Sequence, residues 1–278
     1  MIIREVENPK LRDLIGWTKR PTKEKYDSSA EHILDKAQLV GSGKGAITLA
    51  LRYLFWKNII ANRNDEIIVP DWMGTWVYNQ MLPWIFPVKK FSERVKAIFV
   101  YHQYGFPQDM DKILEFARDK NLVVIEDCAH ALRSYYKGRL LGSMGDFVIY
   151  SFSKWFFCFA LGGMTSKYDD FPAFAHKLMA DVPVGITLTK EFVKCIYEWS
   201  RFLNSPFFSR YAILFLHMSY SFYEEAFRPS RLAKKLFTYK IGYEIAIRQK
   251  RYQYFLQQVG DIGICDHLEK DGITPYIV

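Results

Sequence analysis

A lysine and an aspartate, each following an apolar run, are the residues of this sequence best suited to chemistry. Lys154 comes soon after Phe147–Tyr150, and a desolvated lysine amine can form a Schiff base with a carbonyl group. Asp127 follows the apolar run 122–125 and lies 27 residues before Lys154. A carboxylate there could serve a cofactor that needs a protonated ring nitrogen. The two residues together suggest pyridoxal phosphate.

Each of these residues also has an ordinary structural interpretation. Most lysines are solvated, but Lys154 lies between FVIYSFS and WFFCFALGG, which favours a desolvated amine. Taken alone, Asp127 would better fit a helix cap or an ion-pair partner, and Glu126 is expected to be structural. His130 could stack on a cofactor ring or hydrogen-bond its 3′-oxygen, whereas His102 is more often a structural histidine.

A glycine-rich turn, GSGKGA at residues 41–46, is expected to open a helix whose first amides could bind a phosphate. It is not a Walker loop, because Gln38 stands where the first glycine is needed. Gly45 stands where serine or threonine would bind magnesium. Alone, such a turn is more often a simple tight turn than a phosphate site.

Other side chains could complete a cofactor site. Ser151 or Ser153 could add a hydroxyl contact to the phosphate. Trp72 or Trp76 could stack on the cofactor ring, although most tryptophans at such places belong to the core. Gly162 and Gly163 are expected to allow a close turn after Lys154.

Short β-rich runs alternate with helical patterns between residues 40 and 165. The expected strands are 66–69, 96–101, 122–125 and 147–150, with a short one from 87, and the expected helices are 46–62, 78–84 and 109–120. This alternation predicts an α/β fold, with a mainly parallel sheet sandwiched by helices. Ligands gather at the carboxyl ends of such strands. Pro70, His102, Asp127 and Ser151 all fall there.

Three parts of the chain are distinguished. They are an N-terminal segment, 1–37, a cofactor-binding large domain, 38–170, and a mainly helical region, 171–278. Residues 272–278 read as the start of a strand, so we expect the small C-terminal subdomain to be truncated or absent. The aromatic segment 191–227 is expected to pack against a partner. Attachment to an anionic membrane is a weaker alternative, because its charges are interspersed rather than confined to one face.

Composition excludes several classes of protein. The 278 residues carry a net charge of +8, but the basic residues are scattered, which argues against nucleic acid as a partner. The four cysteines have no paired spacing, which argues against a zinc site or a disulfide framework and fits a reducing cytoplasm. An aromatic content of 17% suggests a subunit interface. No signal or membrane span is expected, so the prediction is a soluble cytoplasmic protein without a metal.

The order of the motifs resembles one known family. A Gly-Ser-Gly helix start is followed by Pro70, YHQYGFPQDMDKI, VVIEDCAHALRSYYKGRLLGSMGDFVIYSFSK and LGG. This series resembles the DegT/StrS-type sugar aminotransferases, fold-type I pyridoxal-phosphate enzymes, over residues 38–166. In the family a threonine stands at the position of Lys44.

The resemblance implies a role for each matching position. Lys154 would be the Schiff-base lysine and Asp127 the partner of the pyridine nitrogen. His130 would contact the ring. Backbone groups of Gly43, Lys44 and Gly45 would bind the phosphate, with Ser151 adding a hydroxyl.

The implied function is a pyridoxal-phosphate-dependent aminotransferase acting on a nucleotide-linked keto sugar, with an amino acid such as glutamate as donor. The resemblance also implies a homodimer. The alternative is a truncated or degenerate relative that binds the cofactor or serves as an assembly partner without transaminase activity.

Overall fold

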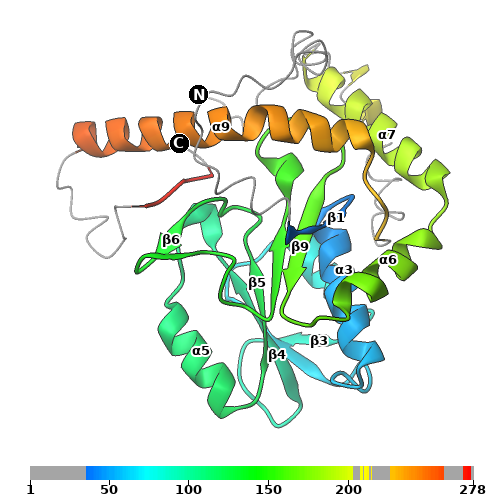
Figure 1. Ribbon diagram of the computed structural model, residues 1–278, viewed down its shortest axis with the longest axis vertical. Coiled ribbons are helices and arrows are strands. Elements are labelled where there is room, and N and C mark those ends of the chain that lie inside the picture. The colour runs from blue at the N-terminus through cyan, green and yellow to red at the C-terminus, as the bar shows by residue number, and fades with distance from the viewer. Residues whose placement is uncertain are drawn as a thin grey trace.

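The computed structural model describes residues 36–202, 226–259 and 272–276, together with a few positions between 207 and 214. Its main sheet has seven strands in the order β1-β9-β8-β5-β4-β2-β3 (Figure 1). The strands are β1 (Gln38–Val40), β2 (Glu66–Ile68), β3 (Phe86–Val88), β4 (Val95–Tyr101), β5 (Val123–Asp127), β8 (Phe147–Tyr150) and β9 (Gly162–Ser166). A two-stranded sheet joins β6 (Tyr135–Tyr136) to β7 (Arg139–Leu140).

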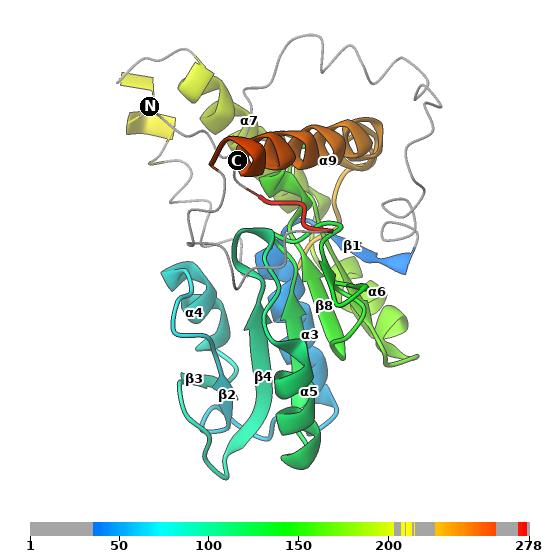
Figure 2. The ribbon, with the colours of Figure 1, turned by 90° about the vertical axis from the view of Figure 1, so that its left-hand side faces the viewer.

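The helices surround this sheet (Figures 1 and 2). They are α3 (Gly43–Trp56), α4 (Thr75–Met81), α5 (Met110–Asp119), α6 (Phe171–Ala180), α7 (Val184–Phe202) and α9 (Arg231–Val259), with short 3₁₀ turns η2 (Gln103–Gly105) and η3 (Phe152–Lys154). Strands β3, β2, β4, β5 and β8 pair in parallel, whereas β9 runs antiparallel to β8 and β1. The prediction of a mainly parallel sheet covered by helices, followed by a helical region, is therefore confirmed.

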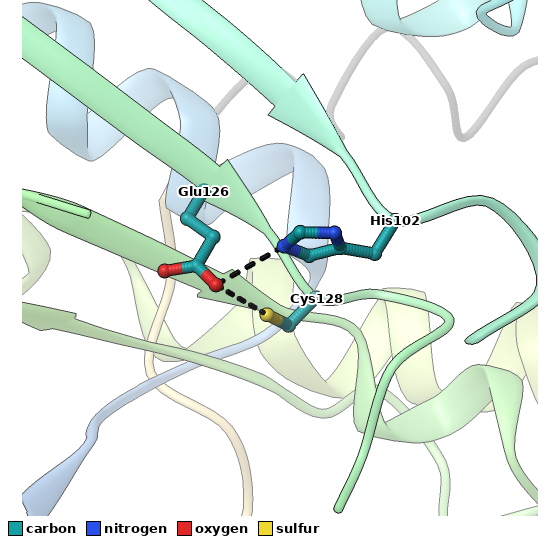
Figure 3. A group of neighbouring side chains, drawn as sticks. All are labelled: His102, Glu126 and Cys128. Atoms are coloured by element: carbon teal, nitrogen blue, oxygen red, sulfur yellow. Dashed lines mark hydrogen bonds and ion pairs between the residues drawn. The ribbon is translucent and has the colours of Figure 1, made fainter. Parts of the chain in front are cut away.

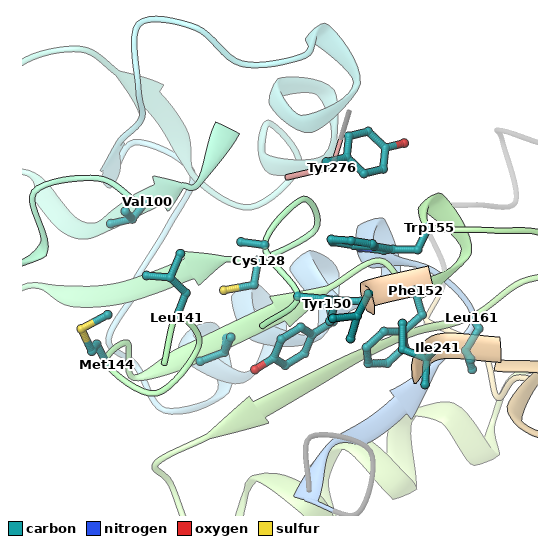
Figure 4. Close-up of a cluster of buried hydrophobic side chains, with 14 of the residues drawn as sticks. Val100, Cys128, Leu141, Met144, Tyr150, Phe152, Trp155, Leu161, Ile241 and Tyr276 are labelled. Atoms are coloured by element: carbon teal, nitrogen blue, oxygen red, sulfur yellow. The ribbon is translucent and has the colours of Figure 1, made fainter. Parts of the chain in front are cut away.

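The core has two parts, because successive strand residues point to opposite faces of the sheet. Phe99 of β4 belongs to the cluster beneath α3, together with Leu49 and Tyr53 of that helix. The neighbouring Ile98 and Val100 belong to the cluster on the other face. That second cluster also takes in the turn after β8 and helix α9 (Figure 4).

Helix α3 begins three residues earlier than predicted and ends six residues earlier. The side chain of Ser42 caps it by accepting a hydrogen bond from the Gly45 amide at 3.0 Å. Asn58 adopts a left-handed conformation with φ of 56°, which stops the helix before residue 62.

Helix α4 lies three residues before the predicted 78–84. Leu82 is still helical at the C-cap, but Pro83 has no amide to continue the hydrogen bonds of the helix, and Gly74 stands at the N-cap. Helix α5 follows the prediction, because Asp109 caps it by accepting from the Lys112 amide.

Two predictions near the chain's glycines are wrong. Gly162 and Gly163 lie in strand β9 rather than in a turn. A Cβ on Gly162 would lie 2.5 Å from the backbone carbon of Ser42, so a glycine in this strand permits close backbone contact.

Residues 272–276 form no strand. They are irregular, because Gly272 is left-handed with φ of 73° and Pro275 lacks an amide donor. They bind instead to the loop after β5, where the hydroxyl of Ser134 accepts from the Thr274 amide at 3.0 Å.

Helix α9 connects this segment to the rest of the core. Phe237 of α9 packs on Phe152 and Phe156, with ring centroids 4.5 and 5.5 Å away.

In the described ranges, no helix is long and apolar enough to cross a membrane. Residues 1–35 and most of 203–225 lie outside these ranges, so the expected packing of the segment 191–227 on a partner stays a prediction.

Candidate active site

The candidate site lies at the carboxyl ends of three neighbouring parallel strands. Tyr101, the last residue of β4, pairs with Asp127, the last residue of β5, and Asp127 pairs with Ile149 of β8. The chain then turns through Ser151 into η3, which ends at Lys154. The order of strands therefore brings together residues that the sequence separates.

Asp127 is buried, with 5% of its surface exposed. One carboxylate oxygen accepts a hydrogen bond from the Ala129 amide at 2.8 Å, which fixes the side chain in a local turn. Burial raises the pKa of Asp127, while the positive charge of Lys154 and the Ala129 bond oppose the rise. The carboxylate is thus buried and lies within the electrostatic influence of Lys154.

Lys154 touches His130 directly. The Nζ atom lies 3.2 Å from Nε2 of the imidazole, and Nδ1 of the same ring lies 2.5 Å from the hydroxyl of Tyr101. The ring of Tyr276 stacks on the imidazole, with centroids 4.0 Å apart and planes 10° from parallel. Burial and the charge of Lys154 lower the pKa of His130 to about 2, so the imidazole is neutral.

The turn that carries Lys154 is held from two sides. The indole N–H of Trp155 donates to the carbonyl of Ala129 at 3.2 Å. Arg248 of α9 donates to the carbonyl of Trp155 at 2.9 Å and also to the carbonyl of Tyr276. Because the guanidinium makes both bonds, α9 fixes the lysine turn and the segment 272–276 relative to each other.

The start of α3 lies against Ser151, at the beginning of the turn that carries Lys154. A Cβ on Gly43 would lie 2.9 Å from Cβ and 3.3 Å from Oγ of Ser151, so only glycine allows this approach. The Ser151 hydroxyl therefore lies beside the first turn of the helix, where backbone amides attract anions. The Gly45 amide, however, donates to Ser42. One of the amides predicted to bind the phosphate, that of Gly45, is thus already used in capping the helix.

Lys44 places a second amine near Lys154. Its Nζ atom lies 4.6 Å from the ring centre of Trp76. Burial lowers the pKa of Lys44 to about 8, and the charge of Lys154 contributes to the same shift. Two lysines and one buried carboxylate leave an excess of positive charge, which suits an anionic ligand.

The two candidate tryptophans differ in position. Trp76, on α4, is 45% exposed and faces Lys44, whereas Trp72 is 76% exposed. The geometry thus favours Trp76 over Trp72 as the tryptophan of the candidate site.

Glu126 belongs to a separate buried cluster behind the site, with His102 and Cys128 (Figure 3). Its carboxylate accepts from Nε2 of His102 at 3.0 Å and from the backbone amides of Gly142 and Gly145 at 2.6 and 2.8 Å. Burial alone would raise the pKa of Glu126, but these hydrogen bonds lower it overall.

The spacing of this cluster would also suit a metal ion, but the ring nitrogens of His102 are engaged. Nδ1 accepts from the Gln108 amide at 3.3 Å, so the proton of the neutral ring lies on Nε2 and is donated to Glu126. We therefore interpret Glu126 and His102 as structural. They fix the loop 142–145 against the end of β5.

Three residues at the site were not predicted from the sequence: Tyr101, Tyr276 and Arg248. Tyr101 immediately precedes His102 at a predicted strand end, and this position could have drawn attention to it. Tyr276 and Arg248 reach the site through packing between distant segments, for which the sequence carries no local pattern.

The donor groups fit pyridoxal phosphate. Lys154 offers an amine and Asp127 a buried carboxylate on an adjacent strand end. The first turn of α3 lies beside the Ser151 hydroxyl, and Lys44 of that turn supplies additional positive charge. The roles of these residues are taken up as proposals below.

Comparison with known proteins shows which sequences and folds the chain resembles. Over 64 residues the chain is 48% identical to GDP-perosamine synthase of Escherichia coli O157:H7, covering 23% of this chain and 18% of that protein. Over 97 residues it is 47% identical to dTDP-3-amino-3,6-dideoxy-alpha-D-galactopyranose transaminase of Aneurinibacillus thermoaerophilus, covering 34% and 25%. The matches therefore span a quarter or less of the length of these two relatives.

A solved structure extends the similarity in fold. The aminotransferase TlmJ of Streptoalloteichus hindustanus superposes with a TM-score of 0.61 at 17% identity, covering 99% of this chain and 77% of that one. At this identity the likeness concerns the fold alone. The sequence model of the DegT/DnrJ/EryC1/StrS aminotransferase family matches residues 88–182, which include Asp127, His130 and Lys154. The resemblance to this family, inferred from the order of the motifs, is thereby confirmed over residues 88–182.

Proposed function

We propose that this protein is a pyridoxal-phosphate-dependent aminotransferase that aminates a nucleotide-linked keto sugar, with an amino acid such as glutamate as donor. The observation that carries the proposal is the position of Lys154, near enough to the buried Asp127 on the neighbouring strand end to oppose the rise in its pKa, beside a helix start suited to phosphate. The names of the two relatives, a perosamine synthase and a sugar transaminase, support a nucleotide sugar as substrate.

Each residue has a defined task in this proposal. When bound, the cofactor supplies an electron sink that stabilises negative charge at the substrate carbon. Lys154 binds the cofactor carbonyl through Nζ and later carries a proton at that atom. Asp127 keeps a proton on the ring nitrogen. The amides at the start of α3, the Ser151 hydroxyl and Lys44 bind the phosphate, and Trp76 covers the ring.

Cofactor uptake tests the proposal directly. The purified protein is mixed with pyridoxal phosphate, dialysed and examined for the visible absorbance of bound cofactor. Borohydride reduction followed by peptide mass spectrometry then identifies the modified lysine. We expect the label on Lys154, and we expect Lys154→Ala to lose both absorbance and label.

The second lysine of the pocket provides a matched control. Lys44→Ala should still carry the label on Lys154, because Lys44 is proposed to bind phosphate rather than the carbonyl. A label found on Lys44 in the unaltered protein would reverse the two assignments. A protein that takes up no cofactor would contradict the proposal as a whole.

Turnover distinguishes the enzyme from a binding protein. Amination of GDP- and dTDP-linked 4-keto sugars, with labelled glutamate as donor, is followed by mass spectrometry of the sugar product. Cofactor uptake without amination of either sugar would support the alternative, a family member that binds the cofactor without transaminase activity.

Two further expectations follow from the resemblance. We propose a homodimer, which light scattering of the purified protein would test. We also propose that the protein acts in the cytoplasm. The described Cys128, Cys158 and Cys195 form no disulfide, which is compatible with that compartment.

A further inference from the structure

Tyr101 is linked to the site lysine through an intervening histidine. Its hydroxyl lies 2.5 Å from Nδ1 of His130, and Nε2 of that ring lies 3.2 Å from Nζ of Lys154. Stacking of Tyr276 on the imidazole at 4.0 Å restricts its movement out of plane. The three side chains form a continuous hydrogen-bonded array from β4 to η3.

A neutral imidazole carries one ring proton, and this limits the array to two arrangements. If Lys154 is an ammonium, it donates to Nε2, so the ring proton lies on Nδ1 and is donated to the oxygen of Tyr101. If Lys154 is a neutral amine, its lone pair can accept, so the ring proton can lie on Nε2 and be donated to Nζ. The hydroxyl of Tyr101 then donates to Nδ1. A hydroxyl satisfies Nδ1 in both cases, because it can donate and accept.

We propose that Tyr101 is a positioning residue for Lys154, holding His130 so that its tautomer follows the charge on the lysine. This inference rests on the proposed role of Lys154, which must lose a proton before its amine can attack a carbonyl. Among the described residues, the titratable groups placed around the array are Lys44 of α3, Asp127 of β5, Tyr104 of η2 and Tyr276.

The proton movement is balanced. An Nζ–H proton of Lys154 passes to Nε2 of His130, the Nδ1–H proton passes to the oxygen of Tyr101, and the original hydroxyl proton of Tyr101 passes to water. Lys154 ends as a neutral amine, the imidazole and the phenol remain neutral, and one hydronium ion forms. No atom changes oxidation state.

The first test uses the protein without cofactor. Nitrogen-15 spectra of histidine-labelled protein report which ring nitrogen of His130 carries the proton, and His130→Gln assigns the signal. We expect the Nδ1–H form near pH 7 in the unaltered protein and the Nε2–H form in Lys154→Met, which has no ammonium. The same tautomer in both proteins would overturn the proposal.

The second test measures the rate of pyridoxal phosphate uptake as a function of pH. Tyr101→Phe should slow uptake about tenfold, the effect of losing one hydrogen bond, and should alter the pH profile while the final amount bound stays the same. Tyr104→Phe is the matched control, because its ring stacks on the same imidazole at 6.0 Å. It should behave as the unaltered protein.

The two tests separate this inference from the proposed function. If the unaltered protein takes up no cofactor, the proposed function fails, while the tautomer experiment still decides the hydrogen-bonded array. If cofactor is taken up and Tyr101→Phe matches the unaltered protein in rate and pH profile, only the role of Tyr101 is wrong.

Discussion

Replacing Glu126 by glutamine exchanges a carboxylate for an amide of nearly the same size in the buried cluster behind the site. One oxygen of Glu126 accepts from His102 and Gly142, at 3.0 and 2.6 Å. The other accepts from Met144 and Gly145, at 3.2 and 2.8 Å. An amide has only one oxygen, so in either orientation two of these N–H donors face an NH₂ group.

The cost follows from this count of donors. A hydrogen bond to a charged group contributes about 1.5–3 kcal/mol, so losing two gives a destabilisation of about 4 kcal/mol. That is a large part of the 5–15 kcal/mol typical of a domain, so we expect partial unfolding at moderate temperature. The folded protein also has to accommodate the unpaired donors at a site where Glu126 has no exposed surface.

The effect should depend on pH in a defined direction. The pKa of Glu126 is lowered on folding from 4.5, so its stabilising contribution is complete above that value. The contribution is lost as the pH falls through the lower pKa of the folded state. The difference in stability between the two proteins should therefore be constant near pH 7 and shrink in acid.

Urea unfolding followed by circular dichroism measures the difference. Asp111→Asn is the matched control, because Asp111 is an exposed carboxylate paired with Lys137 at 2.7 Å and Arg139 at 2.5 Å. Exposed ion pairs of this kind contribute little, so its midpoint should hardly move. Equal midpoints for Glu126→Gln and Asp111→Asn would refute the structural role assigned to Glu126.

Three further predictions concern Lys44 and Trp76 at the candidate site and Arg248, which binds the segment 272–276. Lys44→Thr should weaken pyridoxal phosphate binding about tenfold near pH 7. The tighter binding by the unaltered protein should disappear as the pH rises past about 8, where the Lys44 amine becomes neutral. Absorbance titrations of both proteins near pH 7 and above pH 8 measure the two affinities. Equal affinities of the two proteins near pH 7 would contradict the prediction. Trp76→Ala should weaken cofactor binding about tenfold whereas Trp72→Ala should not, as the same titration would show. Arg248→Met should speed hydrogen exchange in 272–276, because both carbonyl bonds are lost, and unchanged exchange would show that other contacts hold the segment.

Much of the sheet could be predicted because its central strands are apolar on both faces. The run Phe147–Tyr150 was predicted with its observed bounds, since it is buried throughout. Strand β9 was missed, because GGMTS has two glycines and little β propensity, and it forms through pairing with β8 and β1. Local composition identifies a buried strand but not a strand that depends on its neighbours.

The residues of the candidate site also fall into two groups, those that local sequence predicts and those that depend on tertiary contacts. Lys154, Asp127 and His130 were identified from apolar flanks and strand ends, and the structure brings them together. The choice between Trp72 and Trp76 depends on where helix α4 begins, three residues before the predicted start. The position of Tyr276 on the ring of His130 depends on contacts between distant parts of the chain, which no local sequence pattern encodes.

The surroundings of Lys154 are completed by contacts between residues far apart in the sequence. These contacts determine when the candidate site can form during folding. The bond from Arg248 to Trp155 joins residues 93 positions apart, and the bond from Ser134 to Thr274 joins residues 140 apart. Closing such loops costs chain entropy before the contacts compensate for it, so contacts of this kind arise late in folding. The sheet carrying Asp127 can therefore assemble before Arg248 and residues 272–276 pack around Lys154. A ligand whose binding requires these late contacts would bind only to a nearly complete fold. Such a ligand would not assist the early steps of folding.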